Sequence, residues 1–571
     1  MTAQRRGATL ILLGLVVALF AVFVAMTGGI DTRLAGVPVR SRSWERPATL
    51  ALLLLGAGVF FLRQAFAWLP RRLFRALPAL VVVWGAAAAL IFGTYAAGGA
   101  DSFGYISQAE LFAHGRLTDA VPMHPAFNWP DAPYTLTPLA FTRGPDPTRL
   151  VPVYPPGLPM MMAPFARIHP AAVFLVVPLC AALALWCCLR LGRELGDPDA
   201  GTLGALLLSV SPTFLLQAVQ PMSDVPVTAC WLAALVLARR PRAIFAALAG
   251  GAASLAVLVR PNLAPLVLFV VLSSATASED DRPLAALLSK RSLWRAVICA
   301  AAMLPGFLVL GLIQNARYGS PLGSGYGTFN DLFALSNIRP NLARYPRWLT
   351  LAHSPFIWLW LIAPIWFHRS VGRARTFGWI CYGFTAAVVA AYLPYIYFRP
   401  EEWSYTRFLL PALPFMMLFG TGVLLLALRR WLPGRALPAA AVVTVGLAGW
   451  MLYSAEALGV FRVREGERKY PEIGTFVRDR LPRSALVLAA QHSGSVRYYS
   501  HRPTLRWDVL DRASLDRALS SMRDAGYDPF LVVDTGEDEE FRARFAAAGQ
   551  RALAGLTPVT TIGNTTVYAF R

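Results

Sequence analysis

Ionisable side chains stand at the ends of several long apolar stretches of this chain, and two of them are carboxylates that could act in acid–base chemistry. Asp101 lies in GGADSFGYISQAELF, directly after an apolar block, and Asp224 lies in LLQAVQPMSDVPVTACWL between two blocks. A carboxylate can accept the proton of a hydroxyl group as a new bond forms, an effect typically worth about 10²–10⁴-fold in rate. Asp is also a favoured residue at helix N-termini, so helix capping is the alternative interpretation of both residues.

Two arginines lie beside apolar stretches, and one of them could bind a phosphate group. Arg260 stands in the apolar stretch LAVLVRPNLAPLVL, where an ionisable residue is a functional hypothesis by default. A guanidinium can hold two phosphate oxygens at once. Arg407 follows Glu402 and Tyr405 in EEWSYTR, directly before the apolar run FLLPALP. The alternatives are a snorkelling or loop-capping role for Arg260 and a solvated face for the EEWSYTR turn.

The composition shows where these side chains must be held. The 571 residues are 56% hydrophobic and only 15% charged. The apolar residues come in blocks of roughly 17 to 22, the length that a helix needs to cross a bilayer. Examples are Leu10–Met26, Leu50–Phe66, Leu80–Ala97, Ala171–Cys188 and Phe408–Leu428. A carboxylate at the bilayer centre would cost about 2.5–3.5 kcal/mol, so Asp101 is expected at the interface, sharing a helix face with Tyr105.

The net charge of +21 follows from arginines clustered in every second gap between blocks, and it does not indicate nucleic-acid binding. Basic gaps mark the cytoplasmic side of a membrane protein. The pattern predicts about thirteen spans in a bacterial cytoplasmic membrane, with the N-terminus inside and the C-terminus outside. All six cysteines lie in apolar blocks, without metal-ligand spacing. No disulfide, metal site or cofactor is expected, with a divalent cation as the alternative.

Three polar segments fall on the predicted external side: residues 98–170, 314–354 and 397–407. From about Phe461 the composition becomes that of a soluble protein. SALVLAA and PFLVVDT predict buried strands, DRASLDRALSSMRDAG and EDEEFRARFAAAG predict helices, and TPVTTI and TTVYAF predict a hairpin. The predicted fold is an all-α polytopic bundle of about thirteen helices with a small C-terminal α/β domain outside. Its parts are residues 1–75 (two N-terminal spans), 76–456 (the membrane core with the large external loop 98–170) and 457–571 (the external domain).

Five motifs resemble, in order and on one predicted membrane face, the GT-C integral membrane glycosyltransferases. The similarity is to the family-39-like branch, with aminoarabinose transferases, protein O-mannosyltransferases and rhizobial galacturonosyltransferases. The motifs are GGADSFGYISQAELFAHGRLT, VPVYPPGLPMMMAPF, QPMSDVPVTACWLA, VRPNLAPL and EEWSYTRFLLPALP, within roughly residues 76–455.

This resemblance implies a polyprenyl-phosphate-linked sugar donor and a hydroxyl acceptor reached from outside. It implies that Asp101 is the base, that Asp224 and Glu110 are supporting acids, and that Arg260 and Arg407 hold the donor phosphate. Tyr105, Glu402 and Tyr405 complete the implied substrate-binding set. Two features depart from the family: two additional spans precede Asp101, and no acidic pair of the DxD type lies near it. The reaction is therefore expected to be independent of metal.

Other functions share part of this pattern. A lipid-linked sugar flippase or another transporter would have a similar number of spans, but it would show paired broken helices and polar residues near the midplane. An oligosaccharide ligase or polymerase would use the same kind of donor. An inactive envelope scaffold would have lost the external acids, which are present here. The sugar is left open, and the acceptor is a lipid, a glycan or a protein.

Overall fold

The computed structural model describes residues 69–277, 289–371, 374–397 and 402–570, with the first seven as backbone only, and short pieces between residues 9 and 54. The chain forms two compact units, Met1–Pro78 and Ala79–Arg571. The first contains the hairpin of β1 (Ile30–Leu34) and β2 (Val37–Ser41). The predicted spans Leu10–Met26 and Leu50–Phe66 lie largely outside the described residues.

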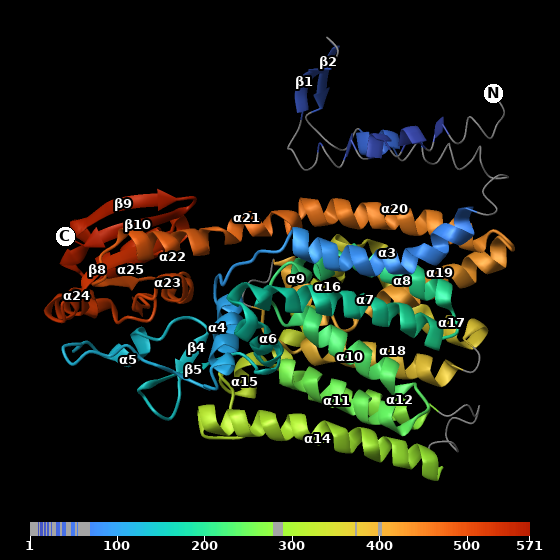
Figure 1. Cartoon of the computed structure of the whole chain (residues 1–571), viewed down its shortest axis with the longest axis horizontal. Helices are drawn as coiled ribbons and strands as arrows, with labels where there is room; N and C mark the ends of the chain where they lie inside the picture. Colours follow the sequence, from blue (N-terminus) through green and yellow to red (C-terminus); the bar gives the residue numbers. More distant parts are fainter. Residues whose placement is uncertain are drawn as a thin grey trace. The chain divides into compact units, whose positions relative to one another are not determined.

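The second unit is mainly a bundle of apolar helices (Figure 1). Four helices are long and apolar enough to cross a membrane, and six spans result if each of two bent pairs counts as one. The predicted number of about thirteen spans is not confirmed. The four are Pro170–Glu194, which includes α7 (Val176–Glu194), α14 (Lys290–Tyr318), α19 (Leu413–Trp431) and α20 (Ala436–Ala457).

Prolines and polar residues divide other apolar blocks into shorter helices. The pair α8 (Pro198–Ser209) and α9 (Pro212–Ala218) is bent by 62°, and the segments Leu335–His353 and Pro355–Arg369 by 116°. A proline inside a helix removes a backbone hydrogen bond. Each of the two bends accordingly lies just before a proline. The remaining helices of the bundle are α3 (Leu69–Ile91), α10 (Asp224–Ala238), α11 (Ala243–Val259), η2 (Pro261–Leu266), α12 (Val267–Ala275), α16 (Ile338–His353), η4 (Pro355–Ile362), α17 (Ala363–Ser370) and α18 (Arg375–Tyr392).

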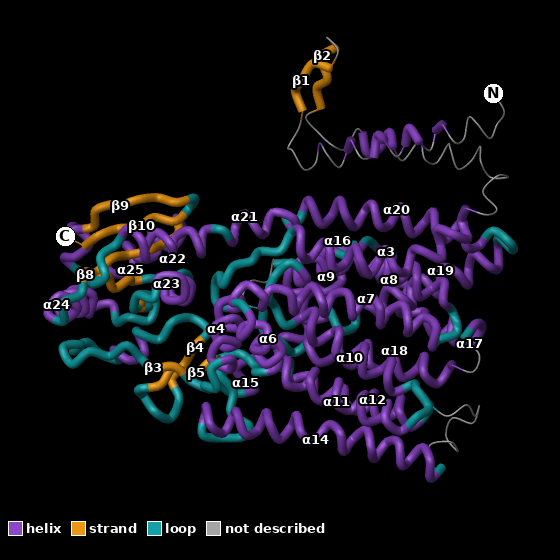
Figure 2. Tube along the Cα trace, viewed as in Figure 1, coloured by secondary structure: helices purple, strands orange, loops and turns teal. Residues whose placement is uncertain are grey.

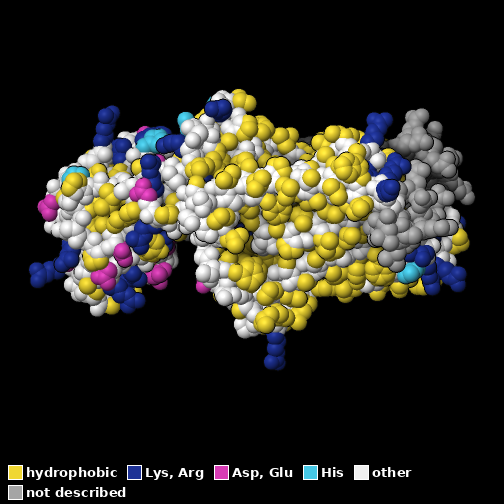
Figure 3. Space-filling model, turned by 90° about the horizontal axis from the view of Figure 1, so that it is seen from below, with side chains coloured by type: hydrophobic (Ala, Val, Ile, Leu, Met, Phe, Trp, Pro, Cys, Tyr) yellow, Lys and Arg dark blue, Asp and Glu magenta, His cyan; other side chains and the backbone are white. Residues whose placement is uncertain are grey.

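The outer faces of the bundle are apolar, as expected of a protein surrounded by lipid. On α14 the side chains of Leu308 and Leu312 are 65% and 71% exposed, and on α20 Val442 is 63% exposed. Figure 3 shows hydrophobic side chains spread over the helical part, whereas the visible Asp and Glu side chains gather over the end that carries the C-terminal sheet. The chain is thus an integral membrane protein with one polar end.

The predicted polar segment 98–170 folds at this polar end. It begins with α4 (Asp101–Ala113) and ends with α6 (Gly157–Ile168). Between them lies a small sheet of order β3-β5-β4, in which both neighbouring pairs are antiparallel (Figure 2). Its members are β3 (Asp119–Ala120), β4 (Phe141–Arg143) and β5 (Arg149–Pro152), with the short helix α5 (Ala132–Thr135) inserted. Two further short elements are α15 (Phe329–Leu332) and η6 (Trp403–Leu409).

The C-terminal segment contains the predicted strands, helices and hairpin. Its sheet has the order β7-β6-β8-β10-β9, with β6 parallel to β7 and β8, and β10 antiparallel to both neighbours. The strands are β6 (Ala485–Leu488), β7 (Thr504–Leu505), β8 (Asp528–Asp534), β9 (Leu556–Ile562) and β10 (Thr565–Phe570). The helices are α21 (Val463–Glu467), α22 (Lys469–Arg480), α23 (Ser493–Ser500), α24 (Leu515–Asp524) and α25 (Thr535–Ala546).

Candidate active site

Asp101 is held by two side chains from distant parts of the sequence. Arg407 of η6 donates from Nη1 to Oδ2 of Asp101 over 3.0 Å, and the hydroxyl of Tyr154 donates to Oδ1. Asp101 is the first residue of α4, and the N-cap residue before it, Ala100, makes no side-chain capping bond. The structure therefore replaces the capping interpretation with an ion pair and a hydrogen bond.

Asp224 and Arg260 form a second ion pair, and it is deeply buried. Nη2 of Arg260 lies 2.7 Å from Oδ1 of Asp224, and the Asp224 side chain is only 1% exposed. The same Nη2 donates to Oγ of Ser223 over 3.3 Å, and the hydroxyl of Tyr105 donates to that oxygen over 3.0 Å. Ser223 occupies the N-cap position of α10 without making a capping bond. Its hydroxyl instead joins Arg260 to Tyr105 on α4.

The two ion pairs belong to one group of side chains. The rings of Tyr105 and Tyr154 pack with their centroids 4.8 Å apart, which connects the Asp101 pair to Ser223. The ring of Phe408 contacts both arginines, with its centroid 5.3 Å from the guanidinium carbon of Arg260 and 5.1 Å from that of Arg407. Both distances are within cation–π range. We call the group of Asp101, Tyr105, Tyr154, Ser223, Asp224, Arg260, Arg407 and Phe408 the acid–arginine cluster.

Both guanidiniums keep unused donors. A guanidinium carries five N–H groups. Arg407 uses only Nη1 towards Asp101, and Nη1 of Arg260 is buried without a hydrogen-bond partner in the described part of the chain. Buried donors are rarely left unpaired in proteins. The geometry thus leaves two cations beside one ring, each able to bind a further oxygen.

Electrostatics keep the tyrosines of the cluster protonated. Burial raises the pKa of Tyr154 well above its ordinary value, and the charge of Asp101 raises it further. Burial and Asp101 raise the pKa of Tyr105 in the same way. Burial alone would lower the pKa of Arg407, but the attraction of Asp101 outweighs it and the pKa rises. Tyr154 is therefore a hydrogen-bond donor, and Arg407 is a cation, at any physiological pH.

Two predicted site residues lie elsewhere. Glu110 is on the opposite side of α4 from Asp101, because nine residues at 100° each place it half a turn away. Its Oε1 accepts a 2.7 Å hydrogen bond from the hydroxyl of Tyr498 on α23. The Glu402 side chain, at the start of η6, makes no hydrogen bond or ion pair with another described residue. Tyr405 packs against the rings of Tyr397 and Phe408 at the border of the cluster.

Tyr154, Ser223 and Phe408 were missed as site residues, although each lies inside one of the five motifs. Their hydroxyl and ring contacts depend on which helices meet, and the motifs alone do not give this. Glu467 was missed too, and no pattern indicates it, because it stands in the charged run REGERKYPE that looks solvated.

Glu467, the last residue of α21, lies against the chain just before Asp101. A Cβ at Gly98 would stand only 2.2 Å from its Oε2. Its side chain makes no hydrogen bond or ion pair within the described residues. Burial raises the pKa of Glu467, Lys469 opposes this effect and Asp101 adds to it, which leaves the pKa at about 7. A carboxyl group that titrates near neutrality thus adjoins the cluster.

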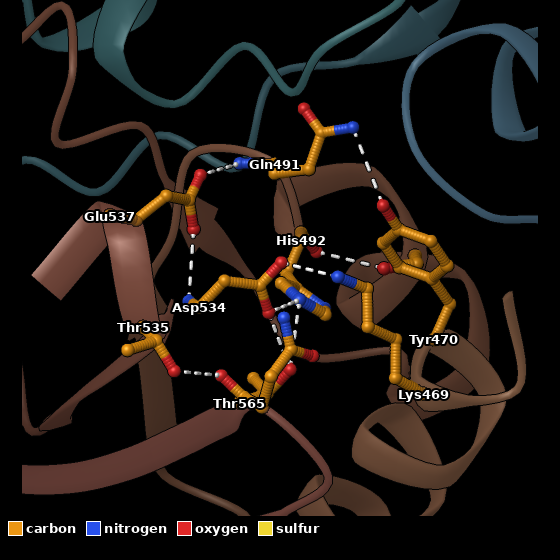
Figure 4. A network of polar contacts seen from close by, with 10 residues as sticks. Lys469, Tyr470, Gln491, His492, Asp534, Thr535, Glu537 and Thr565 are labelled. Atoms are coloured by element: carbon orange, nitrogen blue, oxygen red, sulfur yellow. Dashed lines mark hydrogen bonds and ion pairs between the residues drawn. The ribbon is translucent and has the colours of Figure 1, made fainter. Parts of the chain in front are cut away.

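A second polar network fixes the C-terminal segment itself (Figure 4). Nε2 of His492 lies 3.0 Å from Oδ1 of Asp534, Thr565 donates to the same oxygen over 2.5 Å, and Lys469 pairs with Oδ2. Burial alone would raise the pKa of Asp534, but these three partners lower it. The network joins α22, the loop after β6, β8 and β10, and this arrangement supports a structural role.

The same region contacts the residues that precede α4. Gln491 donates from Nε2 to the hydroxyl of Tyr470 over 3.4 Å, and a Cβ at Gly99 would lie 3.1 Å from that Nε2. Gly99 has φ +54°, a left-handed conformation that suits glycine. The C-terminal segment therefore supports the backbone that leads into Asp101.

The donor atoms for metal binding are sparse. Among the described residues, no group of three or more His, Cys, Asp or Glu is placed to hold a metal ion. The six cysteines are buried and free. What the cluster offers chemically is a carboxylate that can take a proton beside guanidiniums that can bind an anion.

The comparisons with known proteins bear on the fold. The sequence matches no protein-family model and no curated protein. The structure is similar to ArnT from Cupriavidus metallidurans in the apo state, with a TM-score of 0.52 and 14% identity over 87% of this chain and 97% of ArnT. ArnT bound to undecaprenyl phosphate gives a TM-score of 0.50 and 13% identity over 86% and 98%.

The structure also matches an oligosaccharyltransferase from Archaeoglobus fulgidus, with a TM-score of 0.49 and 14% identity. The match covers 88% of this chain and 75% of the oligosaccharyltransferase chain. The two ArnT structures establish the fold. The chain has the GT-C fold that its five motifs predicted.

Proposed function

We propose that this protein is a glycosyltransferase that moves a sugar from a polyprenyl-phosphate-linked donor to a hydroxyl acceptor. The observation that carries this proposal is the pairing of Asp101 with Arg407 and of Asp224 with Arg260 around the ring of Phe408. It places a potential base next to two cations that have free donors. The GT-C fold supports the same class of reaction.

The two arginines would hold the phosphate of the donor. Nη1 of Arg260 and the unused nitrogens of Arg407 could each donate to a phosphate oxygen. When the bond between the sugar and the phosphate breaks, its electron pair leaves on the phosphate oxygen. Fixed cations in a poorly solvated site stabilise that growing charge strongly. The undecaprenyl phosphate bound to ArnT supports a lipid donor of this kind.

Asp101 would act as the base. The acceptor oxygen attacks the anomeric carbon, and its proton passes to a carboxylate oxygen of Asp101 as the new bond forms. Tyr154 and Arg407 orient that carboxylate from two sides. Asp224 has a different task in this account, because its buried pair with Arg260 fixes the guanidinium near Phe408. Glu110 lies too far round α4 to share in the proton transfer.

The reaction would take place at the external face of a bacterial cytoplasmic membrane. The basic gaps of the sequence place the N-terminus inside, and residues 457–571 would then form an external domain. Its partners would be the lipid-linked donor, a lipid, glycan or protein acceptor, and membrane lipids, without nucleic acid.

A lipid-linked sugar flippase is the alternative, and the two bent helix pairs are the feature that favours it, because broken helices are typical of transporters. Mass spectrometry of envelope lipids separates the two functions when a membrane-impermeant reagent has first modified the lipids of the external leaflet. A deletion strain that lacks the transferase should lose a sugar from its acceptor and accumulate the lipid-linked donor on the external face. Accumulation on the cytoplasmic face alone would instead identify a flippase.

A further inference from the structure

A cleft with a mixed polar and apolar lining lies between α4 and the C-terminal segment. It has a volume of about 250 Å³. Ser107 and Glu110 line it from α4, Phe141 from β4, and Arg497 and Tyr498 from α23. None of these five residues belongs to the acid–arginine cluster. We call it the α4–α23 cleft.

Contacts across the cleft fix its walls. The Tyr498 hydroxyl donates to Glu110 over 2.7 Å. Nη2 of Arg497 donates to Oδ2 of Asp119 over 3.0 Å and to the carbonyl oxygen of Ala120 over 3.1 Å. These bonds join the bundle side to the C-terminal segment, so the cleft is built by both. Nη1 of Arg497 is buried and makes no hydrogen bond within the described chain.

The lining combines three kinds of groups. Glu110 and Asp119 accept hydrogen bonds, whereas Arg497 and the exposed His114 can donate them. The rings of Phe103 and Phe141, with centroids 5.8 Å apart, form an apolar wall. Binding pockets for small polar ligands have this composition, an apolar surface with a few placed polar groups. Sugar hydroxyls both donate and accept, and sugar rings have apolar C–H faces that suit the phenylalanines.

We propose that the α4–α23 cleft binds a carbohydrate unit of the acceptor, and this inference rests on the proposed transferase function. The cleft is at the opposite side of α4 from Asp101, and Glu110 lies nine residues, about 13.5 Å, further along the helix axis. A sugar bound there cannot carry the reacting hydroxyl itself. The acceptor is therefore an extended glycan or glycolipid, held by one unit while another reaches Asp101.

The Ser107→Trp variant tests this proposal by filling the cleft. Among the described residues, the Ser107 hydroxyl bonds only to the Phe103 and Gly104 carbonyls of its own helix, so its loss removes no contact between these elements. A second variant, His114→Ala, removes an exposed lining side chain whose one hydrogen bond in the described part of the chain is to its own helix. Ala546→Trp, exposed at the end of α25, is the matched control.

The readout is saturation-transfer NMR on the purified full-length protein, with neutral trisaccharides of glucose, mannose, galactose and arabinose as probes. The expected result is binding of at least one trisaccharide to the wild type and the control, at least tenfold weaker binding to Ser107→Trp, and several-fold weaker binding to His114→Ala. Equal binding by the variants, or no binding by the wild type, would overturn the proposal. So would capture of a serine-containing peptide in place of the sugars.

Transfer measured on the same proteins keeps the two proposals apart. With an acceptor that carries the bound trisaccharide, Ser107→Trp should raise the acceptor KM about tenfold and leave kcat and the donor KM unchanged. If Ser107→Trp is active and its acceptor KM is unchanged, the proposed role of the cleft is refuted, whereas the proposed transferase function is not affected. If the wild type binds a trisaccharide in the cleft but transfers no sugar, the proposed transferase function is refuted, whereas carbohydrate binding by the cleft is supported.

Discussion

Arg407 donates to Asp101 over 3.0 Å, although the two residues are 306 positions apart in the sequence. This single contact joins the first polar segment to the short helix before α19, and it brings a base and a phosphate-binding cation together. The proposed reaction needs both groups within reach of the same sugar–phosphate bond.

Loss of the Arg407 cation should therefore impair transfer. Arg407→Gln is expected to lower kcat about 10²–10³-fold, because a fixed charge no longer faces the departing phosphate. Arg407→Lys should recover only part of the rate, since an ammonium group cannot bind two oxygens in a plane. The measurement is sugar transfer by purified variants at equal amounts of folded protein. Arg339→Gln, exposed on α16, is the control, and equal losses in both variants would contradict the assignment.

Tyr154 should matter through its hydroxyl alone. Tyr154→Phe keeps the ring packed against Tyr105 but removes the donor to Asp101. A hydrogen bond to a charged group is worth about 1.5–3 kcal/mol, so the rate should fall roughly 10- to 100-fold. Tyr134→Phe in the same polar segment removes a hydroxyl that has no described hydrogen-bond partner, and it should retain full activity. A Tyr154→Phe protein as active as the wild type would show that Asp101 needs no orientation from this side.

Close packing behind Arg260 predicts a sharp contrast between two glycines. Val259, next to Arg260, and Gly251 both belong to α11, whereas Gly157 belongs to α6. A Cβ at Gly157 would lie 2.2 Å from the backbone nitrogen of Val259, but a Cβ at Gly251 would meet nothing within 4 Å. Gly157→Ala should destabilise the protein by about 1–3 kcal/mol, the usual effect of overpacking. Gly251→Ala should leave stability unchanged or raise it by up to about 1 kcal/mol. Thermal unfolding in detergent checks both, and similar melting temperatures would contradict the packing.

Activity should depend on pH through Glu467. Its pKa of about 7 lies above the ordinary value of 4.5, so the side chain is neutral in acid and ionises as the pH passes 7. A new negative charge at Glu467 attracts the proton that leaves the acceptor hydroxyl. The rate of transfer should accordingly rise across pH 6–8 in the wild type. This rise should be absent from the pH–rate profile of Glu467→Gln.

The free energy of unfolding should depend on pH in the opposite direction to the rate. Between pH 4.5 and 7 the folded state binds more protons at Glu467 than the unfolded state, so this residue makes stability fall as the pH rises. Glu467→Gln should remove that decline. Glu465→Gln, exposed on the same helix, is the control for both measurements. A Glu467→Gln variant with the rate and stability profiles of the wild type would show that Glu467 does not influence the site.

The sequence indicated all four charged residues of the cluster, but not their partners. Asp101, Asp224, Arg260 and Arg407 stood out because a charge beside an apolar block is costly. Their pairing depends on how α4, α10, α11 and η6 meet, and helices far apart in the sequence give no local signal of this. Capping was therefore a reasonable alternative for Asp101 and Asp224 until the contacts were seen.

The role of Glu110 as a supporting acid stays a prediction of the family resemblance. The helical period turns its side chain towards α23, where it accepts a hydrogen bond from Tyr498. The predicted number of about thirteen spans is not confirmed among the described residues, where breaks such as those at Pro212 and Pro355 leave helices shorter than a bilayer. The C-terminal strands and helices were predictable, since their alternating pattern and the Gly563–Asn564 turn are local features.

The role of Asp101 is the central claim, and sugar transfer to envelope acceptors tests it most directly. Glycolipids and glycoproteins would be compared by mass spectrometry in a deletion strain complemented with the wild type, Asp101→Asn or Asp146→Asn at equal membrane levels. Asp146 lies in the same polar segment, where its exposed carboxylate bonds to Thr148. The account predicts that Asp101→Asn lacks the same sugar as the uncomplemented deletion, while Asp146→Asn restores it. Full restoration of the sugar by Asp101→Asn would contradict the account.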